Sequence, residues 1–238
     1  MSLSCAICQP HYLPWVGYFE MIDRVDVFVF LDDVQFIKRE WKNRNRIRSG
    51  PTTEDTKWLT VPAVKEDQMK AIKDVRISEH SDWVQNHLNS IRHTYQGTPY
   101  FTPWFDRISE KLDEFRNMTV GNLNIALISW LCEEMGIGTK LVLSSDLDVP
   151  GKKEQKLINI CGAIGADFYL ANNATATYTG EADFGPHGIE FRTQDYTHPE
   201  YAQFNKGKGL PFISHLSVID LLFNHDTAGK EILLSTRS

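Results

Sequence analysis

Three consecutive segments at the start of the chain limit what it can fold into. Residues 4–8 form a short apolar run, residues 13–22 carry apolar side chains at helical spacing, and residues 25–31 are rich in β-branched and aromatic side chains. Two parallel strands need a crossover connection, and one helix of this length supplies it. The opening therefore predicts a β-loop-α-β unit, the building block of a parallel sheet.

The same alternation returns in the second half of the chain. Strands are expected at residues 140–143, 167–170 and 189–192, and a helix is expected at residues 153–164 between the first two. The remaining expected elements are helices at 82–95, 105–115, 120–135 and 217–223 and shorter strands at 57–63 and 75–77. We therefore predict an α/β fold with a mostly parallel, doubly wound sheet and helical insertions. The 238 residues are expected to form one domain, 1–238, with a helical sub-region at about 80–135.

Composition and charge narrow the class of protein. Hydrophobic residues make up 42% of the chain, and the formal net charge is −6. This acidic balance disfavours nucleic acid and anionic membranes as partners. No apolar run is long enough to cross a bilayer, and Gln9, Pro10 and His11 interrupt any signal-peptide core. We therefore expect a soluble, cytoplasmic protein.

The cysteines are too sparse for a disulfide framework. There are 4 in the chain, and only Cys5 and Cys8 have the C-x-x-C spacing. No second pair of this kind accompanies them, and both lie within an expected strand. We interpret them as buried thiols in a reducing compartment and assign no metal site.

Polar residues follow four of the expected strands. They are Gln9 to Tyr12, Asp32 and Asp33, Ser144 and Ser145, and Asn172 and Asn173. In open parallel sheets, ligands bind beyond the carboxyl ends of the strands. The sequence therefore predicts a pocket at this edge of the sheet.

The first of these strand ends reads QPHYLPWVGYF over residues 9–19. Its hydrogen-bonding groups and flat faces suit a nucleotide base or a sugar, and we assign substrate contacts to Gln9, Tyr12, Trp15 and Tyr18. His11 is a candidate catalytic residue. The alternative is that the aromatic residues belong to the core and the turn.

Asp32 and Asp33 follow the expected seven-residue, mostly apolar strand at residues 25–31. Together with His11 they form the candidate catalytic set. Either carboxylate can serve as a general base, a metal ligand or an acceptor for a ribose hydroxyl. The alternative for both is a helix cap or an Asx-turn. The sequence leaves the two interpretations open.

The segment KREWKNRNRIR, residues 38–48, is dense in cations and contains a single acid, Glu40. In an acidic protein such a run indicates an anion site for phosphate, pyrophosphate or carboxylate. The alternative is a solvated basic hairpin. Candidate substrate-binding residues are Lys38, Arg44 and Arg46 for phosphates, Asn43 and Asn45 for orientation, and Trp41.

Several familiar catalytic motifs are absent from the sequence. It contains no G-x-S-x-G, no Walker A motif and no G-x-G-x-x-G. Their absence argues against an α/β-hydrolase, a P-loop kinase and a dinucleotide-binding enzyme of the usual kind.

Long blocks of the chain resemble the WbqC-like family. They are QPHYLPWVGYF, DDVQFIKREWKNRNRI, LSSD, GADFYL and LSVIDLLFN, which together span nearly the whole sequence. The family is associated with gene clusters for O-antigen and other surface polysaccharides. The resemblance thus implies a role in making or modifying an activated sugar, but it does not supply the reaction.

A weaker resemblance concerns the fold of the opening. The β-loop-α-β start is similar to that of pantothenate synthetase and other adenylate-forming enzymes of the HUP class. His11 matches the first histidine of their H-x-G-H-like motif, but the stretch from Trp15 to Tyr18 lacks the second. No Lys-Met-Ser-Lys-like loop is evident, although Lys206 and Lys208 offer cations for such a role.

These observations favour a transferase or ligase that acts on a nucleotide-activated amino sugar or on its acyl donor. The expected partner is a nucleotide or nucleotide-sugar ligand. The sequence does not identify a cofactor. A nucleotide with Mg²⁺ is compatible with the carboxylates of Asp32 and Asp33. The alternative is a non-catalytic nucleotide-sugar-binding or scaffold protein of the same pathway.

Overall fold

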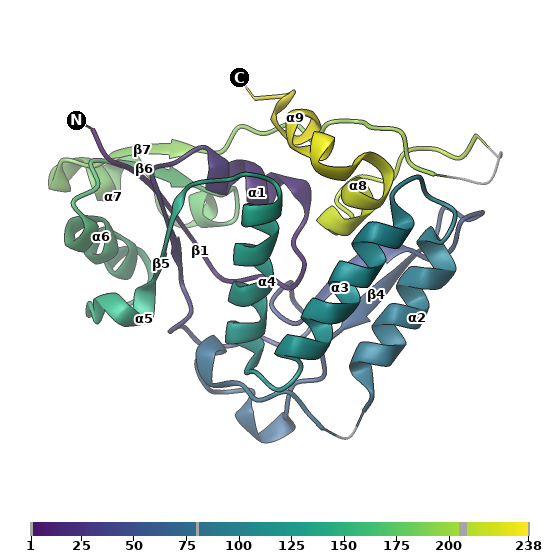
Figure 1. The fold of residues 1–238 in the computed structure, drawn as a ribbon. Helices are drawn as coiled ribbons and strands as arrows, with labels where there is room; N and C mark the ends of the chain where they lie inside the picture. Colours follow the sequence, from purple (N-terminus) through teal and green to yellow (C-terminus); the bar gives the residue numbers. More distant parts are fainter. Residues whose placement is uncertain (1, 80, 205–208, 238) are drawn as a thin grey trace.

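A computed structural model describes residues 2–79, 81–204 and 209–237 of the chain. It confirms the predicted parallel α/β fold (Figure 1). Within the described residues, a five-stranded parallel sheet has the order β5-β2-β1-β6-β7. The strands are β1 (Ser4–Cys8), β2 (Val27–Phe30), β5 (Lys140–Leu143), β6 (Phe168–Ala171) and β7 (Glu190–Thr193).

The central strand β1 marks the point where the winding of the sheet reverses. From β1 the chain adds β2 and then β5 on one side, and it later adds β6 and β7 on the other. The register aligns Cys8 with Phe30 of β2 and Ala6 with Leu170 of β6. The connections after β1 and β6 therefore leave the sheet in opposite directions, which opens a crevice beyond the carboxyl ends of these two strands.

Helices cover both faces of the sheet because side chains alternate along each strand. Ala6 and Cys8 of β1 face one core with the helices α1 (Val16–Asp23), α4 (Val120–Glu134) and α8 (Val218–His225). Cys5 and Ile7 face the other core with α6 (Lys153–Ile164) and α7 (Glu181–Phe184). Figure 1 shows α5 (Ser144–Leu147), α6 and α7 on one side of the sheet and α1 and α4 on the other.

A second, antiparallel sheet of β3 (Arg44–Arg48) and β4 (Thr56–Thr60) lies outside the main one. Ile47 and Leu59 turn inward to the core, and α2 (Trp83–Tyr95) and α3 (Phe101–Phe115) pack on this side of the molecule. The remaining elements are the 3₁₀ helices Lys65–Asp67, Ile72–Asp74, Thr175–Thr177, Gly185–His187 and Asp226–Ala228, and α9 (Gly229–Leu234).

Two helices begin at other residues than the spacing predicts. The first begins at Val16 and not at residue 13, because Leu13 has a positive φ of 40° and Pro14 follows it. Helix α3 begins at Phe101 and not at residue 105, and it includes Pro103. Proline is tolerated there because the first turn has no intrahelical partner for its missing N–H.

The expected strand at residues 75–77 does not form. Arg76 and Ile77 make only isolated bridges, to Thr119 and Ala63. In the described part of the chain, no helix is long and apolar enough to cross a membrane.

Candidate functional site

A cavity of about 490 Å³ lies beyond the carboxyl ends of β1 and β6, where the winding of the sheet reverses. We call it the strand-end pocket. Five of the residues to which the sequence assigned substrate or catalytic roles line it, namely Gln9, His11, Trp15, Tyr18 and Trp41. Other lining residues include Cys8, Glu40, Lys42, Asn172, Asn173, Tyr178, Gln194 and Tyr196.

Lys42 brings a cation into this pocket. The residue is only 5% exposed, and its ammonium donates to the carboxylate of Glu40. The Asn124 side chain of α4 fixes the local backbone, because its Nδ2 donates to the carbonyls of Lys42 at 2.6 Å and Pro10 at 3.0 Å. Two loops are thereby joined, and the charged end of Lys42 is held at a defined place.

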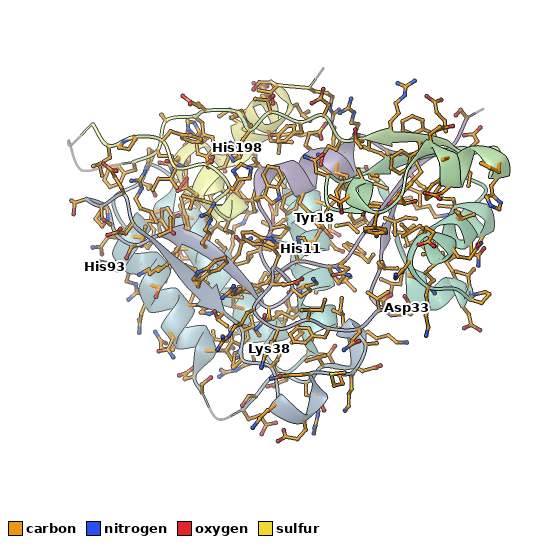
Figure 2. The ribbon with its side chains drawn as sticks, turned by 180° about the vertical axis from the view of Figure 1, so that it is seen from behind. His11, Tyr18, Asp33, Lys38, His93 and His198 are labelled. Carbon is orange, nitrogen blue, oxygen red and sulfur yellow. The ribbon has the colours of Figure 1, made fainter. Side chains whose placement is uncertain are left out.

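His11 lies beside Lys42 as a neutral imidazole. Burial and then the charge of Lys42 lower the pKa of His11 to about 3. Its ring lies 5.1 Å from that of Tyr18, whose hydroxyl donates to the Gln9 carbonyl at 2.9 Å. Figure 2 shows His11 and Tyr18 together near the middle of the molecule. A neutral histidine in a pocket retains a nitrogen that can accept a proton.

Aromatic rings and amides complete the walls. Trp15 packs against Tyr196 with ring centroids 5.8 Å apart, and Tyr178 is 54% exposed beside the opening. The Asn172 Nδ2 donates to the Cys8 sulfur at 3.4 Å. Flat rings with a few fixed polar groups and a charged pair, here Lys42 and Glu40, are typical of small-molecule sites.

Tyr12, Asn43 and Asn45 do not line the pocket. Tyr12 is fully buried, and its hydroxyl lies 2.9 Å from Nδ1 of His87. The Asn43 amide donates to the Val61 carbonyl at 3.0 Å. Asn45 donates to two backbone carbonyls of the loop before α1, at 3.2 and 2.7 Å. The two asparagines thus hold backbone in place, and Tyr12 is paired within the core.

The two strand-end acids also have partners elsewhere. The Asp32 carboxylate accepts from the backbone N–H and the hydroxyl of Ser145, at 3.0 and 2.7 Å, and so caps the start of α5. Asp33 accepts from the Lys156 ammonium at 2.8 Å. Neither acid is among the lining residues, and Figure 2 places Asp33 to one side of His11.

The cations of the basic segment lie mainly on the outer hairpin. Arg46 donates to the carbonyls of His215 and Ser214 at 3.3 and 3.4 Å. The guanidinium of Arg44 stacks over the Trp58 ring, 4.1 Å from its centroid. Lys38 is exposed and set apart from His11 in Figure 2. Lys206 and Lys208 fall outside the described residues.

Sequence reasoning missed several lining residues. Lys42 and Glu40 stand within the basic segment, but nothing in the sequence distinguishes Lys42 from its neighbours. Gln194 follows β7 directly, so the strand-end rule that singled out Asn172 and Asn173 also leads to it. The Gln194 Nε2 donates to the Gly17 carbonyl of α1 at 2.8 Å.

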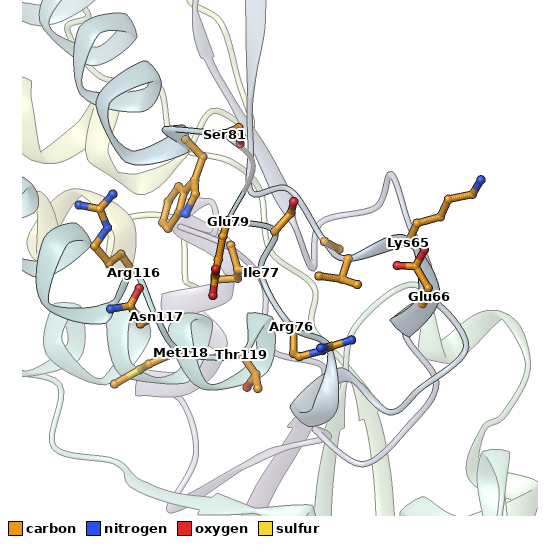
Figure 3. A pocket seen from close by; sticks show the side chains of 14 residues that line it. Lys65, Glu66, Arg76, Ile77, Glu79, Ser81, Arg116, Asn117, Met118 and Thr119 are labelled. Atoms are coloured by element: carbon orange, nitrogen blue, oxygen red, sulfur yellow. The ribbon is translucent and has the colours of Figure 1, made fainter.

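A larger hollow of about 880 Å³ lies elsewhere, between the loop that carries Lys65 and Arg76 and the turn before α4 (Figure 3). The two arginines that line it are paired with nearby acids. Arg76 binds both oxygens of the Asp67 carboxylate at 2.7 and 3.1 Å, and Arg116 binds Asp113 at 2.9 Å. No strand end of the parallel sheet reaches it, so we place the candidate site in the strand-end pocket.

A metal centre finds no support in the described part of the chain, where no three His, Cys, Asp or Glu side chains form a group that could hold an ion. The C-x-x-C pair illustrates why. Cys5 and Cys8 are buried in the cores on opposite faces of the sheet. Side chains three apart on a strand point to opposite sides, so this pair cannot share a metal.

The fold is that of an α/β protein with a cavity at the reversal point of a parallel sheet. A model of the WbqC-like protein family matches residues 9–232, and the chain belongs to this family. It is 33% identical over 221 residues to the uncharacterized protein Rv1507c of Mycobacterium tuberculosis, with 92% of each chain covered. No solved structure gave a significant match.

Proposed function

We propose that the strand-end pocket binds a nucleotide-activated amino sugar or its acyl donor. The protein would act on this ligand as a transferase or ligase of surface-polysaccharide biosynthesis, in the cytoplasm. The observation that carries the proposal is the buried Lys42 ammonium, which pairs with the Glu40 carboxylate and lies among aromatic rings and amides at the reversal point of the sheet. Family membership supports the sugar pathway as the setting.

Each wall of the pocket suits one part of such a ligand. A phosphate or carboxylate interacts with the Lys42 ammonium, which is an effective point charge where water is scarce. Trp15 and the exposed Tyr178 offer flat faces to the apolar side of a sugar ring. The amides of Gln9 and Asn173 can bind hydroxyl groups.

His11 is the residue best placed to move a proton. An amine or hydroxyl that attacks an activated carbonyl or phosphate must lose a proton, and the neutral imidazole can accept it. The Lys42 charge is one cause of the low pKa of His11. An anionic ligand that offsets this charge raises the pKa of His11 and makes it a better base.

The binding part of the proposal is tested by calorimetry with UDP-, dTDP- and GDP-sugars. We expect at least one to bind the wild type and to lose about tenfold or more in affinity with Lys42→Met, because a hydrogen bond to a charged group contributes about 1.5–3 kcal/mol. Lys140→Met is the matched control, since Lys140 is exposed and is the first residue of the edge strand β5, away from the pocket. Equal affinities in all three proteins would contradict the proposal.

The catalytic part is tested by mass spectrometry. The wild type is incubated with the bound nucleotide sugar, ATP and a set of amino and acyl donors, and we expect a mass change that His11→Gln abolishes while binding persists. Binding without any mass change would instead support the non-catalytic alternative.

A further inference from the structure

An exposed aromatic surface adjoins the strand-end pocket. We call it the tryptophan shelf, and it consists of Trp41, Trp58 and Arg44. Trp41 and Trp58 are 37% and 44% exposed, and their ring centroids lie 5.5 Å apart. The Arg44 guanidinium covers one part of the Trp58 ring, 4.1 Å from its centroid. Large aromatic rings left open to solvent beside a pocket mark a place for a ligand.

The hairpin β3–β4 forces this arrangement. Side chains alternate along β3, so Asn45 and Ile47 turn inward and Arg44 and Arg46 turn outward. Arg46 stands directly opposite Trp58 in the register of the two strands. The indole is thus presented on the outer face, with the Arg44 guanidinium over its ring.

Arg44 has hydrogen-bonding capacity that the fold does not use. Its Nε is buried without a partner among the described residues, and no described carboxylate forms an ion pair with it. Arg46, by contrast, donates to two backbone carbonyls. The guanidinium charge therefore has no carboxylate partner among the described residues, and an anionic ligand would supply one.

The shelf is continuous with the pocket because Trp41 belongs to both. The chain then continues directly to Lys42, the buried cation of the pocket. From outside to inside, the surface thus offers flat rings, cations, and then walls with amides and hydroxyl groups. A nucleoside diphosphate sugar has the same order of parts: a flat base, two phosphates and a polyhydroxyl ring.

We propose that the tryptophan shelf stacks the nucleobase of the ligand while Arg44 and Lys42 face the phosphates and the pocket holds the sugar. This assignment rests on the proposed function, since it divides the same ligand between two subsites. Stacking on an indole tolerates any base, because every base has a flat π-face. Discrimination among bases is therefore expected to be weak at the shelf.

The test uses UDP-N-acetylglucosamine and dTDP-glucose, the free diphosphates UDP and dTDP, and the two sugar 1-phosphates. With Trp58→Ala we expect the affinity for nucleotide sugars and free diphosphates to fall about 5- to 150-fold, the range for loss of one stacked base. The affinity for the sugar 1-phosphates stays unchanged. Trp58→Phe keeps a ring and restores most of the binding.

Two further proteins separate the possible failures. Tyr100→Ala removes an exposed aromatic ring outside the shelf and is expected to bind like the wild type. If Lys42→Met weakens every ligand but Trp58→Ala weakens none, the shelf assignment is wrong and the proposed function stands. Loss of sugar 1-phosphate binding in Trp58→Ala would also overturn the shelf assignment, because the shelf would then hold the sugar. If the wild type binds none of these probes, both proposals fall.

Discussion

At the scale of single residues, Tyr12 and His87 show how a polar pair can belong to the core. The carbonyl of Thr60, 3.2 Å from His87 Nε2, can only accept, so Nε2 carries the proton and Nδ1 accepts from the Tyr12 hydroxyl at 2.9 Å. Burial lowers the pKa of His87 to about 4 and keeps the ring neutral. The pair thus satisfies its own hydrogen bonds far from solvent.

We therefore expect Tyr12→Phe to weaken folding and leave ligand binding intact. The change leaves His87 Nδ1 buried without a donor, which costs about 1–3 kcal/mol in the free energy of unfolding. Chemical denaturation measures this loss, and Tyr100→Phe serves as the exposed control. A lower ligand affinity with unchanged stability would return Tyr12 to the substrate contacts that its sequence position suggests.

Residue identity alone could not separate these roles. Gln9, His11 and Tyr12 stand close together after one buried strand, and local sequence treats them alike. The structure turns His11 to the pocket and Tyr12 to α2. The chain then turns at Leu13, whose positive φ of 40° no pattern of apolar residues predicts.

At the scale of elements, Asn45 links β3 to the loop that carries the pocket residues. Its Nδ2 donates to the carbonyls of Tyr12 and Leu13, and the Ser217 hydroxyl before α8 also donates to Leu13, at 2.8 Å. A non-glycine residue with positive φ stores strain, so these bonds stabilise a loop that would otherwise relax.

Asn45→Ala is expected to lower the free energy of unfolding by about 1–3 kcal/mol, because the Tyr12 carbonyl loses its donor and the Leu13 carbonyl keeps only the Ser217 hydroxyl. Ligand affinity falls as well, since the loop that holds Gln9 and His11 loses its support. Denaturation and calorimetry measure the two effects. Asn122→Ala, at an exposed position of α4, is expected to change neither. An unaltered Asn45→Ala protein would show that the loop is stable without this link.

Elements with strong local signals were predictable, and their mutual contacts were not. Strand β5 and helix α6 form at the predicted residues because apolar spacing and a following Gly165 define them locally. The partner of Asp32 is different. Ser145 lies far along the chain and meets Asp32 only because β2 and β5 are neighbours in the sheet. The cap therefore depends on strand order, which sequence patterns leave open.

At the scale of the whole molecule, buried histidines make the stability of the fold sensitive to acid. Burial lowers the pKa of His11 to about 3 and that of His87 to about 4, and it also lowers the pKa of His198 and His215. The folding stability that each neutral histidine contributes is fully present above the unfolded pKa of about 6.5. This stability is lost as the pH falls, because the unfolded chain then takes up protons that the folded chain does not. Asp220 acts in the opposite sense, since burial raises its pKa to about 6.

We expect the free energy of unfolding to decrease as the pH falls from 7 to 5. His11→Gln removes one of these groups and makes the decrease shallower by up to about 1.4 kcal/mol per pH unit. Denaturation curves at several pH values provide the comparison, with an exposed His93→Gln variant as the control. If His11→Gln and the wild type lose stability in parallel, the His11 imidazole already takes up protons in the folded protein.

The general location of the candidate pocket was predictable at this scale, and its lining was not. The rule that ligands bind beyond the ends of parallel strands leads to Gln9 and Asn172 from sequence alone. The place of Lys42 in the pocket and of Arg44 on the outer hairpin depends on how β3 and β4 pack against the main sheet. One basic run thus divides between two surfaces.

The central claim is that a sugar nucleotide places its anionic group beside Lys42 and His11. Nuclear magnetic resonance of the protein with ¹⁵N-labelled histidine tests it directly, with His11→Gln to assign the signal. With saturating nucleotide sugar, we predict that the His11 imidazole signals shift and that the pKa of His11 rises above its value of about 3 in the free protein, while the exposed His93 is unaffected. Binding that leaves the His11 signals and pKa unchanged would contradict the claim.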